Sequence, residues 1–211
     1  AFPLALAADT ATSEIQFGHL SRPTHANTSW DAARFETVAQ RWMLLDEGAY
    51  RVCVANDASY GHDVRRGGGT DGGHLTIARV TLVRGPLFPD PTADEGRHEF
   101  TVSLLPGAGV ADAIAEGFRL NLPLREATGA IAPFVEADEG VVVEAVKLAD
   151  DRSGDVIVRL YEAFGSFRRA RVRPGFAWRS VEETDLLERT VPTRAVRAVN
   201  DGVVHLELGR F

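Results

Sequence analysis

The feature that most constrains the fold is a series of short apolar segments, rich in β-branched and aromatic residues, separated by turn signals. In chain order the segments read "SEIQFGHL", "YRVCVAN", "LTIARVTLV", "HEFTVSLL", "GVVVEAVKLA", "DVIVRLYEAFG", "RARVRPGFAW" and "VVHLELGRF". In the first of them Ile15 and Phe17 alternate onto one face, as in a strand. Clusters such as "DEG", "GGGTDGG" and "DDRSGD" lie between the segments. This pattern predicts an all-β chain built as a sandwich or as a pair of sandwiches.

Two stretches depart from the strand pattern. "ADAIAEGF" (111–118) is rich in alanine and is expected to form a short helix. "AARFETVAQRWMLLDE" places apolar residues at helical spacing; these are Phe35, Val38, Ala39, Trp42 and Met43. Taken locally, the second stretch favours a helix.

Composition limits the classes of partner. The chain has 211 residues and a net charge of −7, so we expect neither a nucleic-acid binder nor a membrane-surface binder. The single cysteine, Cys53, lies in an apolar run and is expected to be buried. With one cysteine the chain can form no internal disulfide, which predicts a reducing, cytoplasmic compartment. No apolar run is long enough to span a membrane. The chain begins with "AFPLALAA" and has no initial methionine, so we expect a piece of a longer protein.

Motifs for catalysis and metal binding are weak. "GGGTDG" (67–72) matches the dinucleotide-binding pattern, but a strand follows it instead of a helix, so we predict a hairpin loop. The six histidines include no pair at the spacing of a helical zinc motif. No nucleophile elbow is present. The residues alone therefore predict no self-sufficient active site.

The stretch "NDASYGHD" (56–63) concentrates polar side chains around Gly61. The candidates in it are Asn56, Asp57, Tyr60, His62 and Asp63. Such a cluster suits half of a catalytic or metal site, and it equally suits a polar turn that joins two strands. Composition and spacing leave both interpretations open.

Several long segments resemble the C-terminal β-region of the α-mannosidases of glycoside hydrolase family 38. The segments are "IQFGHLSRPTHANTSWDAARFE" (15–36), "VANDASYGHDVR" (54–65) and "FPDPTADEGRHEFTVSLLP" (88–106). "FRLNLPL", "VVVEAVKLAD", "VIVRLYEAFG" and "ETDLLER" continue in the family's order. Ala58 and Ser59 depart from the family, which usually has Cys-Lys there, and "GGGTDGG" looks like an insertion.

The resemblance implies a large parent enzyme. Members of the family cleave terminal α-mannosides with retention of configuration. An N-terminal barrel supplies their aspartate nucleophile and their zinc ligands. Both would lie upstream of this chain, which is therefore expected to contain no catalytic residue and no metal ligand, and to be inactive alone. Its expected partners are the upstream catalytic domain, which holds the zinc cofactor, and the α-mannoside substrate.

The resemblance also implies an architecture. Residues 1–130 would be the later part of a large β-supersandwich, and residues 131–211 a smaller C-terminal β-sandwich. Residues 35–55 would then form paired strands that turn at "DEG", against their local helical spacing. If strands before residue 1 are absent, an unpaired sheet edge remains, and we expect the isolated chain to self-associate.

By the same resemblance, "NDASYGHD" is a candidate rim loop of the sugar site. Tyr60 would stack on a sugar or hydrogen-bond to it, and Asp63 would accept hydrogen bonds from hydroxyl groups. Asn56, Asp57 and His62 complete the set of candidates.

Two alternatives stay open. The first is an autonomous carbohydrate-binding module, with Trp30, Trp42 or Trp178 as its platform. The second is a free-standing hydrolase with a site of its own.

Overall fold

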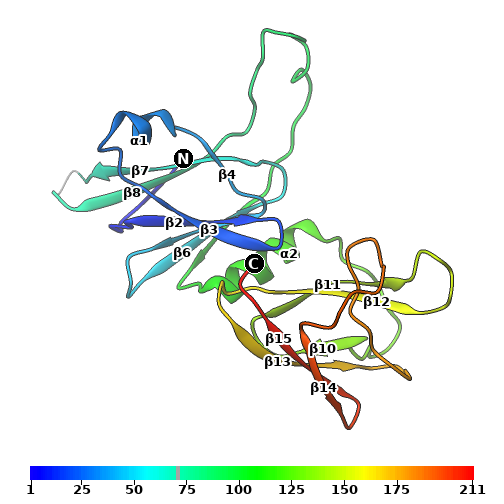
Figure 1. Cartoon of the computed structure of the whole chain (residues 1–211). Coiled ribbons are helices and arrows are strands. Elements are labelled where there is room, and N and C mark those ends of the chain that lie inside the picture. The colour runs from blue at the N-terminus through cyan, green and yellow to red at the C-terminus, as the bar shows by residue number, and fades with distance from the viewer. Residues whose placement is uncertain (70–71) are drawn as a thin grey trace. The chain divides into compact units, whose positions relative to one another are not determined.

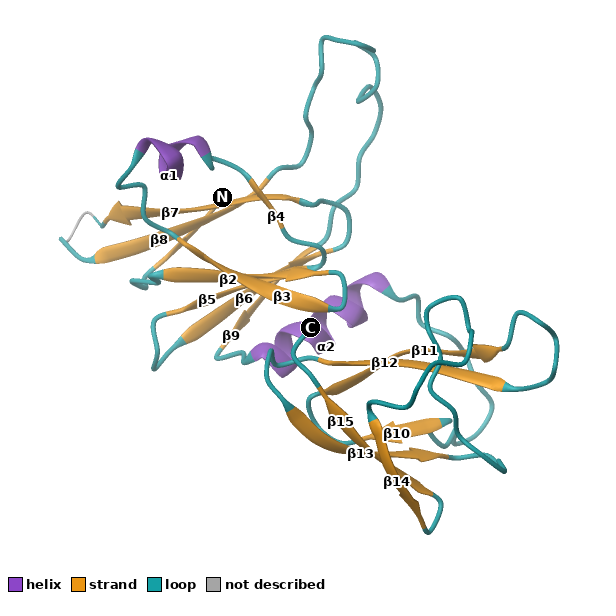
Figure 2. Ribbon diagram, viewed as in Figure 1, coloured by secondary structure: helices purple, strands orange, loops and turns teal. Residues whose placement is uncertain are grey.

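Antiparallel strands dominate both parts of the chain (Figure 2). The structure, a computed structural model, describes residues 1–69 and 72–211. It divides into two units, Ala1–Leu124 and Arg125–Phe211. The observed boundary, after Leu124, precedes the boundary expected after residue 130 by a few residues. The assignment of the two units to a β-supersandwich domain and a C-terminal domain stays a prediction.

The first unit contains two antiparallel sheets. One has the strand order β1-β8-β7-β4 and consists of β1 (Phe2–Leu4), β4 (Thr37–Val38), β7 (Gly61–Gly68) and β8 (His74–Val80). The other has the order β3-β2-β5-β6-β9 and consists of β2 (Thr10–Ile15), β3 (Gly18–Pro23), β5 (Trp42–Asp46), β6 (Arg51–Asn56) and β9 (Val102–Pro106).

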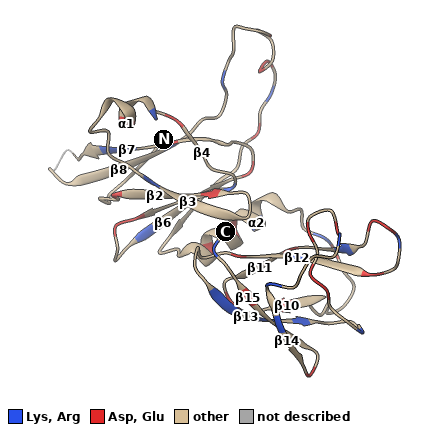
Figure 3. Cartoon of the chain, in the orientation of Figure 1, with Lys and Arg blue, Asp and Glu red and all other residues tan. Residues whose placement is uncertain are grey.

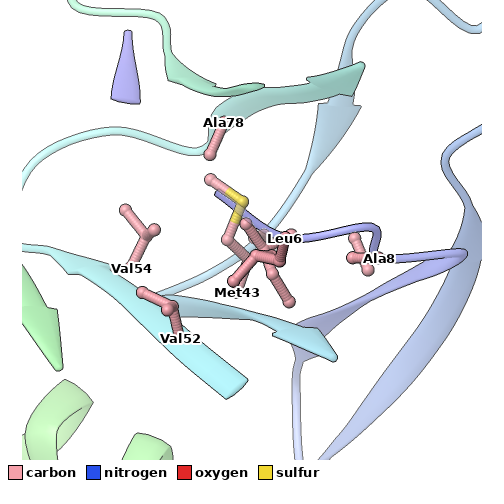
Figure 4. Close-up of a cluster of buried hydrophobic side chains, with 9 residues drawn as sticks. Leu6, Ala8, Met43, Val52, Val54 and Ala78 are labelled. Carbon is pink, nitrogen blue, oxygen red and sulfur yellow. The ribbon is translucent and has the colours of Figure 1, made fainter. Parts of the chain in front are cut away.

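The core of the first unit lies between these two sheets. Met43 of β5 and Val52 and Val54 of β6 pack with Ala78 of β8, as Figure 4 shows. Leu6 and Ala8, which follow β1, complete the centre of the cluster. Because side chains alternate along a strand, Val52 and Val54 share one face of β6 and Cys53 takes the other. The unit is therefore a face-to-face sandwich.

A helix covers the outer face of the five-stranded sheet. This is α2 (Val110–Asn121), which contacts β5 and β6. A Cβ at Gly117 would lie 2.9 Å from Cδ1 of Trp42, so the helix needs a glycine where it crosses that ring. The helix expected over 111–118 is confirmed. The other helix, α1 (Ser29–Ala33), is short and begins with a capping box between Thr28 and Asp31.

The family resemblance implied paired strands over residues 35–55, and residues 42–55 form such a hairpin against their local spacing. Residues 35–41 lie outside it, and Thr37–Val38 (β4) pairs with β7 in the other sheet. β5 and β6 pair from Trp42↔Ala55 to Asp46↔Arg51. Both faces of this hairpin are covered, one by the other sheet and one by α2, so nearly every position is apolar. A strand buried on both faces imitates helical spacing by chance, which explains the misleading local signal.

The expectation of one strand over residues 13–20 is wrong. β2 ends at Ile15 and β3 begins at Gly18, and these two residues pair across a two-residue turn. Phe17 occupies the left-handed region with φ of 60°. Glycine or asparagine is the usual residue in that conformation, so no residue pattern marked the turn there. By contrast, β7 and β8 pair as far as Gly68↔His74, so the two strands on either side of "GGGTDG" form the predicted hairpin, and its first two glycines belong to β7. Thr70 and Asp71 of that motif lie outside the described residues.

The second unit is also a sandwich of antiparallel strands. Its four-stranded sheet has the order β10-β13-β15-β14 and consists of β10 (Val135–Ala137), β13 (Arg168–Pro174), β14 (Val196–Asn200) and β15 (Val203–Leu208). A hairpin of β11 (Val141–Leu148) and β12 (Val156–Glu162) forms the other layer. Val172, Val204 and Leu206 form the core, against which Leu160 of β12 packs. The predicted all-β fold is confirmed.

Candidate functional site

The segment "NDASYGHD" runs from the last residue of β6 to the first residues of β7. Its middle, residues 57–60, is a short connection that we call the Tyr60 loop. It links strands of different sheets, since β6 lies in the five-stranded sheet and β7 in the four-stranded one (Figure 1). The turn interpretation of this stretch is therefore confirmed, and the geometry decides what its polar residues do.

The side chain of Asn56 binds the backbone of the Tyr60 loop. Its side chain is only 2% exposed, and its Oδ1 accepts hydrogen bonds from the backbone N–H groups of Ala58 (3.1 Å) and Ser59 (2.7 Å). This is the asparagine turn in which a side chain replaces a backbone acceptor. Since Oδ1 is identified by these two donors, the amide nitrogen Nδ2 faces the other way and meets Nε2 of His62 at 3.2 Å.

His62 lies inside the sandwich and is 1% exposed. Its Nδ1 lies 2.9 Å from the backbone oxygen of Tyr60. A carbonyl only accepts, so Nδ1 carries the proton, and Nε2 accepts from Asn56. Burial lowers the pKa of His62, and the Tyr60 carbonyl with the carboxylates of Glu36 and Asp63 opposes that effect only in part. His62 is therefore held as one neutral tautomer.

Further hydrogen bonds fix the loop from its flanks. The Tyr60 carbonyl also accepts from the N–H of Ala39 at 3.0 Å. The carbonyl of Thr81 accepts a hydrogen bond from the Ser59 hydroxyl. The N–H of Thr81 donates a hydrogen bond to the carbonyl of Gly61 at 2.9 Å. The Tyr60 loop is thus anchored by hydrogen bonds along its length, although it is a connection at the surface.

Two of the candidates are exposed on this hydrogen-bonded loop. Tyr60 is 64% exposed, although its carbonyl and the neighbouring backbone are hydrogen-bonded. Asp57 is also exposed, and its Oδ1 accepts from the N–H of Thr101 at 2.8 Å. That hydrogen bond lowers the pKa of Asp57, so its carboxylate is ionised well into the acid range.

Asp63 points away from the other candidates. Side chains alternate along β7, so Asp63 takes the face opposite His62. Its two carboxylate oxygens accept hydrogen bonds from Nε of Arg79 at 2.8 and 2.7 Å, and Nε of Arg65 lies 3.3 Å away. The structure therefore brings together Asn56, Asp57, Tyr60 and His62, and separates Asp63. Whether any of the five contacts a sugar stays a prediction.

Asp63 instead lines a groove of about 530 Å³. Residues 63–66 of β7 form one wall of the groove, and residues of the segment 22–37 form the other. Sequence reasoning did not single out this wall, although the Thr28–Asp31 capping box was a signal of ordered structure there. Trp30, within the same segment, is 83% exposed.

The three tryptophans differ sharply in burial. Trp42 is fully buried beneath α2, and Trp178 packs against the core of the second unit. Trp42 is not available as a sugar platform, because a platform needs an exposed ring face. Trp178 is only partly buried, and Trp30 is the most exposed of the three predicted platform residues.

The described residues offer no fit for zinc. No group of three or more His, Cys, Asp and Glu side chains within residues 1–69 and 72–211 is arranged to hold a metal ion. Cys53 is buried as expected, and burial raises the pKa of its thiol to about 12, whereas metal ligation needs the thiolate. No helix of the described chain is long and apolar enough to cross a membrane.

The arginine-rich strand β13 is neutralised by its neighbours. Figure 3 shows its basic residues in blue beside acidic residues of the same unit. Each arginine of the strand has a carboxylate within 4 Å; the pairs are Arg168–Glu162, Arg169–Glu207, Arg171–Asp138 and Arg173–Glu136. This strand consequently presents paired charges instead of a basic patch.

Comparison with known proteins identifies the family. The model described as "Glycosyl hydrolases family 38 C-terminal domain" matches residues 1–92, and "Glycosyl hydrolases family 38 C-terminal beta sandwich domain" matches residues 140–211. The chain belongs to the C-terminal region of glycosyl hydrolase family 38. The resemblance seen in the sequence is thereby confirmed.

Relatives within family 38 are named α-mannosidases. Alpha-mannosidase 2C1 of Homo sapiens is 41% identical over 204 residues, which cover 90% of this chain and 19% of the human protein. Alpha-mannosidase G of Dictyostelium discoideum is 39% identical over 171 residues, covering 75% and 15%. The crystal structure of an alpha-mannosidase from Enterococcus faecalis V583 has the same fold, with a TM-score of 0.64 at 15% identity, and covers 98% of this chain and 25% of that one. The chain spans about a fifth of the length of the curated relatives it matches.

Proposed function

We propose that this chain is the non-catalytic C-terminal β-region of a longer α-mannosidase. In that enzyme it packs against an upstream catalytic domain and contributes the Tyr60 loop to the rim of the sugar site. The catalytic domain supplies the nucleophile and the zinc, and hydrolyses terminal α-mannosides with retention. The names of the relatives and the short share of their length that the chain spans support this proposal. We also propose a cytoplasmic location, which the single buried cysteine favours.

The observation that carries the rim assignment is an exposed aromatic ring on a hydrogen-bonded loop. Preorganised loops bind with less loss of conformational entropy than mobile ones. Tyrosine offers a flat face for the C–H groups of a sugar and a hydroxyl for its oxygens. Asp57, exposed on the same loop, adds a carboxylate acceptor. Asp63 is a weaker candidate than Tyr60, because two arginines already occupy its oxygens.

The test uses the full-length enzyme and p-nitrophenyl α-mannoside. We expect Tyr60→Ala to lower kcat/KM about tenfold, as for the loss of one aromatic contact, and Tyr60→Phe to lower it less if stacking dominates. Asp63→Ala is made in parallel. Tyr50→Phe is the matched control, since Tyr50 is also exposed but lies in the β5–β6 turn. Unchanged kcat and KM in all three site variants would refute the rim assignment.

A second candidate function rests on Trp30. Its exposed ring suits a sugar platform of an autonomous carbohydrate-binding module. Titration of the 211-residue chain with mannose and mannobiose, followed by tryptophan fluorescence, tests it. Binding at millimolar or lower concentration that is lost in Trp30→Phe would favour the module.

The same 211-residue chain also tests for a free-standing hydrolase. Turnover of p-nitrophenyl α-mannoside, lost on mutation of one of the chain's own acidic residues, would establish one.

A further inference from the structure

Asn56 and His62 connect the end of β6 to the start of β7 directly behind the Tyr60 loop. The chain of contacts runs from the N–H groups of the loop to Asn56 Oδ1, from Asn56 Nδ2 to His62 Nε2, and from His62 Nδ1 to the Tyr60 carbonyl. It begins and ends on the loop. A change at either side chain therefore reaches the backbone that bears the tyrosine ring.

The direction of each hydrogen in this chain is fixed. Oδ1 of Asn56 is committed to two backbone donors, so Nδ2 has to donate to His62. A second proton on the imidazole would place an N–H of His62 against the N–H of Asn56, with the two nitrogens 3.2 Å apart. Two buried donors facing one another lose their hydrogen bond and keep the cost of desolvation. Only the neutral imidazole satisfies both partners.

We propose that Asn56 and His62 are positioning residues that hold the Tyr60 loop in the shape in which it meets the sugar, and that the hold is released when His62 is protonated. The part of this proposal that concerns the sugar rests on the proposed function. The part that concerns the loop rests on the hydrogen bonds alone.

The charged groups around His62 are few. Glu36, in the segment that precedes β4, and Asp63, the next residue of β7, both favour the protonated ring. Each is engaged elsewhere: Glu36 accepts from the Thr81 hydroxyl, and Asp63 pairs with Arg79. Asn56, the partner from β6, has no charge to offer. Protonation of His62 therefore gains no ion pair in place of the hydrogen bond that it breaks.

The first experiment measures amide hydrogen exchange in the full-length protein by mass spectrometry. The peptide of interest contains Ala58 and Ser59, whose N–H groups report directly on Asn56. After correction for intrinsic exchange rates, we expect exchange of these amides to be about tenfold faster at pH 5 than at pH 7.5. Asn56→Ala and His62→Phe should show the fast exchange at both pH values.

Asn56→Asp provides a rescue. One oxygen of the carboxylate keeps the two backbone donors, and the other can accept from a protonated His62. The loop of this variant should remain protected at pH 5, where the loop of the wild-type protein opens. His74→Gln is the control, because His74 is an exposed histidine at the start of β8. Equal protection of the wild-type loop at both pH values, or no effect of Asn56→Ala, would overturn the proposal.

The second experiment is a double-mutant cycle in kcat/KM. If Asn56 acts through the tyrosine, Asn56→Ala should lose activity by up to the tenfold expected for Tyr60→Ala, and the double variant should lose no more than Tyr60→Ala alone. Losses that multiply would show that Asn56 acts by another route and would refute the positioning role. If Tyr60→Ala has no effect at all, the rim assignment fails, whereas the exchange experiment still decides whether the pair holds the loop.

Discussion

The carboxylate of Glu14 on β2 accepts hydrogen bonds from both the backbone and the side chain of Arg41, the residue that precedes β5. It accepts from the Arg41 N–H at 2.8 Å and from Nη2 at 2.6 Å. The guanidinium carbon of Arg41 in turn lies 4.0 Å from the ring centroid of Phe118 in α2. Glu14 is 2% exposed, so this ion pair is part of the interior. It links the five-stranded sheet to the helix that covers it.

We predict that Glu14→Gln lowers the free energy of unfolding of the first unit by about 3 kcal/mol. Removing one member of a buried pair leaves the other charge uncompensated, which accounts for the size of the effect. Urea titration of the 211-residue chain measures it. The surface pair of Arg51 and Asp46 supplies the control, and Arg51→Ala should change stability by less than about 1 kcal/mol. Similar losses in the two variants would contradict the special role of Glu14.

Gly61 is predicted to resist any side chain. A Cβ there would lie 2.5 Å from Oε1 of Glu36 and 3.0 Å from Cβ of Thr81. The Glu36 carboxylate ends an exposed side chain and can move away, but Cβ of Thr81 has to shift, so Gly61→Ala should cost about 1 kcal/mol of stability. Gly68 lies on the same strand and has no heavy atom within 4 Å of the corresponding position, so Gly68→Ala should be neutral or slightly stabilising. Thermal melts of both variants, compared with the wild-type chain, test the contrast.

Stability should decline on acidification because of His62. Its pKa in the folded state is lowered from the ordinary 6.5, so the unfolded chain binds the proton more readily. The contribution of His62 is therefore complete above pH 6.5 and is lost as the pH falls from there through the lowered folded pKa. Unfolding free energies of the wild-type chain and His62→Phe over pH 7.5 to 5 should converge. A constant difference between the two proteins across that range would rule this contribution out.

Self-association of the isolated chain stays a prediction, and the structure makes it more specific. β3 is the longest edge strand of the first unit, and Leu20 on it is exposed. Exposed edges pair with other chains, so Leu20→Lys should reduce association. Leu186→Lys, which removes an exposed leucine from a loop of the second unit, is the control. A strictly monomeric sedimentation profile of the wild-type chain at high concentration would count against edge pairing.

Most of the architecture was accessible from the sequence, because turn residues separate the strands clearly. The exceptions have physical causes. The turn at Phe17 lacked a glycine or asparagine in the left-handed position, so two strands looked like one. The hairpin of β5 and β6 was predicted correctly only through the family resemblance, since burial on both faces removes the alternation that marks a strand.

The sequence located the candidate residues as a cluster, but it did not predict which of their side chains are buried, which are exposed, and which lie on the opposite face of β7. Adjacency in sequence placed Asn56 and His62 near each other, whereas their burial depends on which face of β7 turns inward. Alternation then sends Asp63 outward to Arg79. The support from Thr81 and Thr101 comes from residues far along the chain, and no local pattern predicts such partners.

Those two threonines mark the base of the long excursion between β8 and β9, which extends away from the sheets of the first unit (Figure 1). Thr81 is bound to Ser59 at its start, and Thr101 to Asp57 at its end. The excursion is thus closed at its neck by the Tyr60 loop. Residues 82–100 therefore leave and re-enter the first unit at the loop that bears Tyr60, and Thr81 and Thr101 tie both ends of this segment to it.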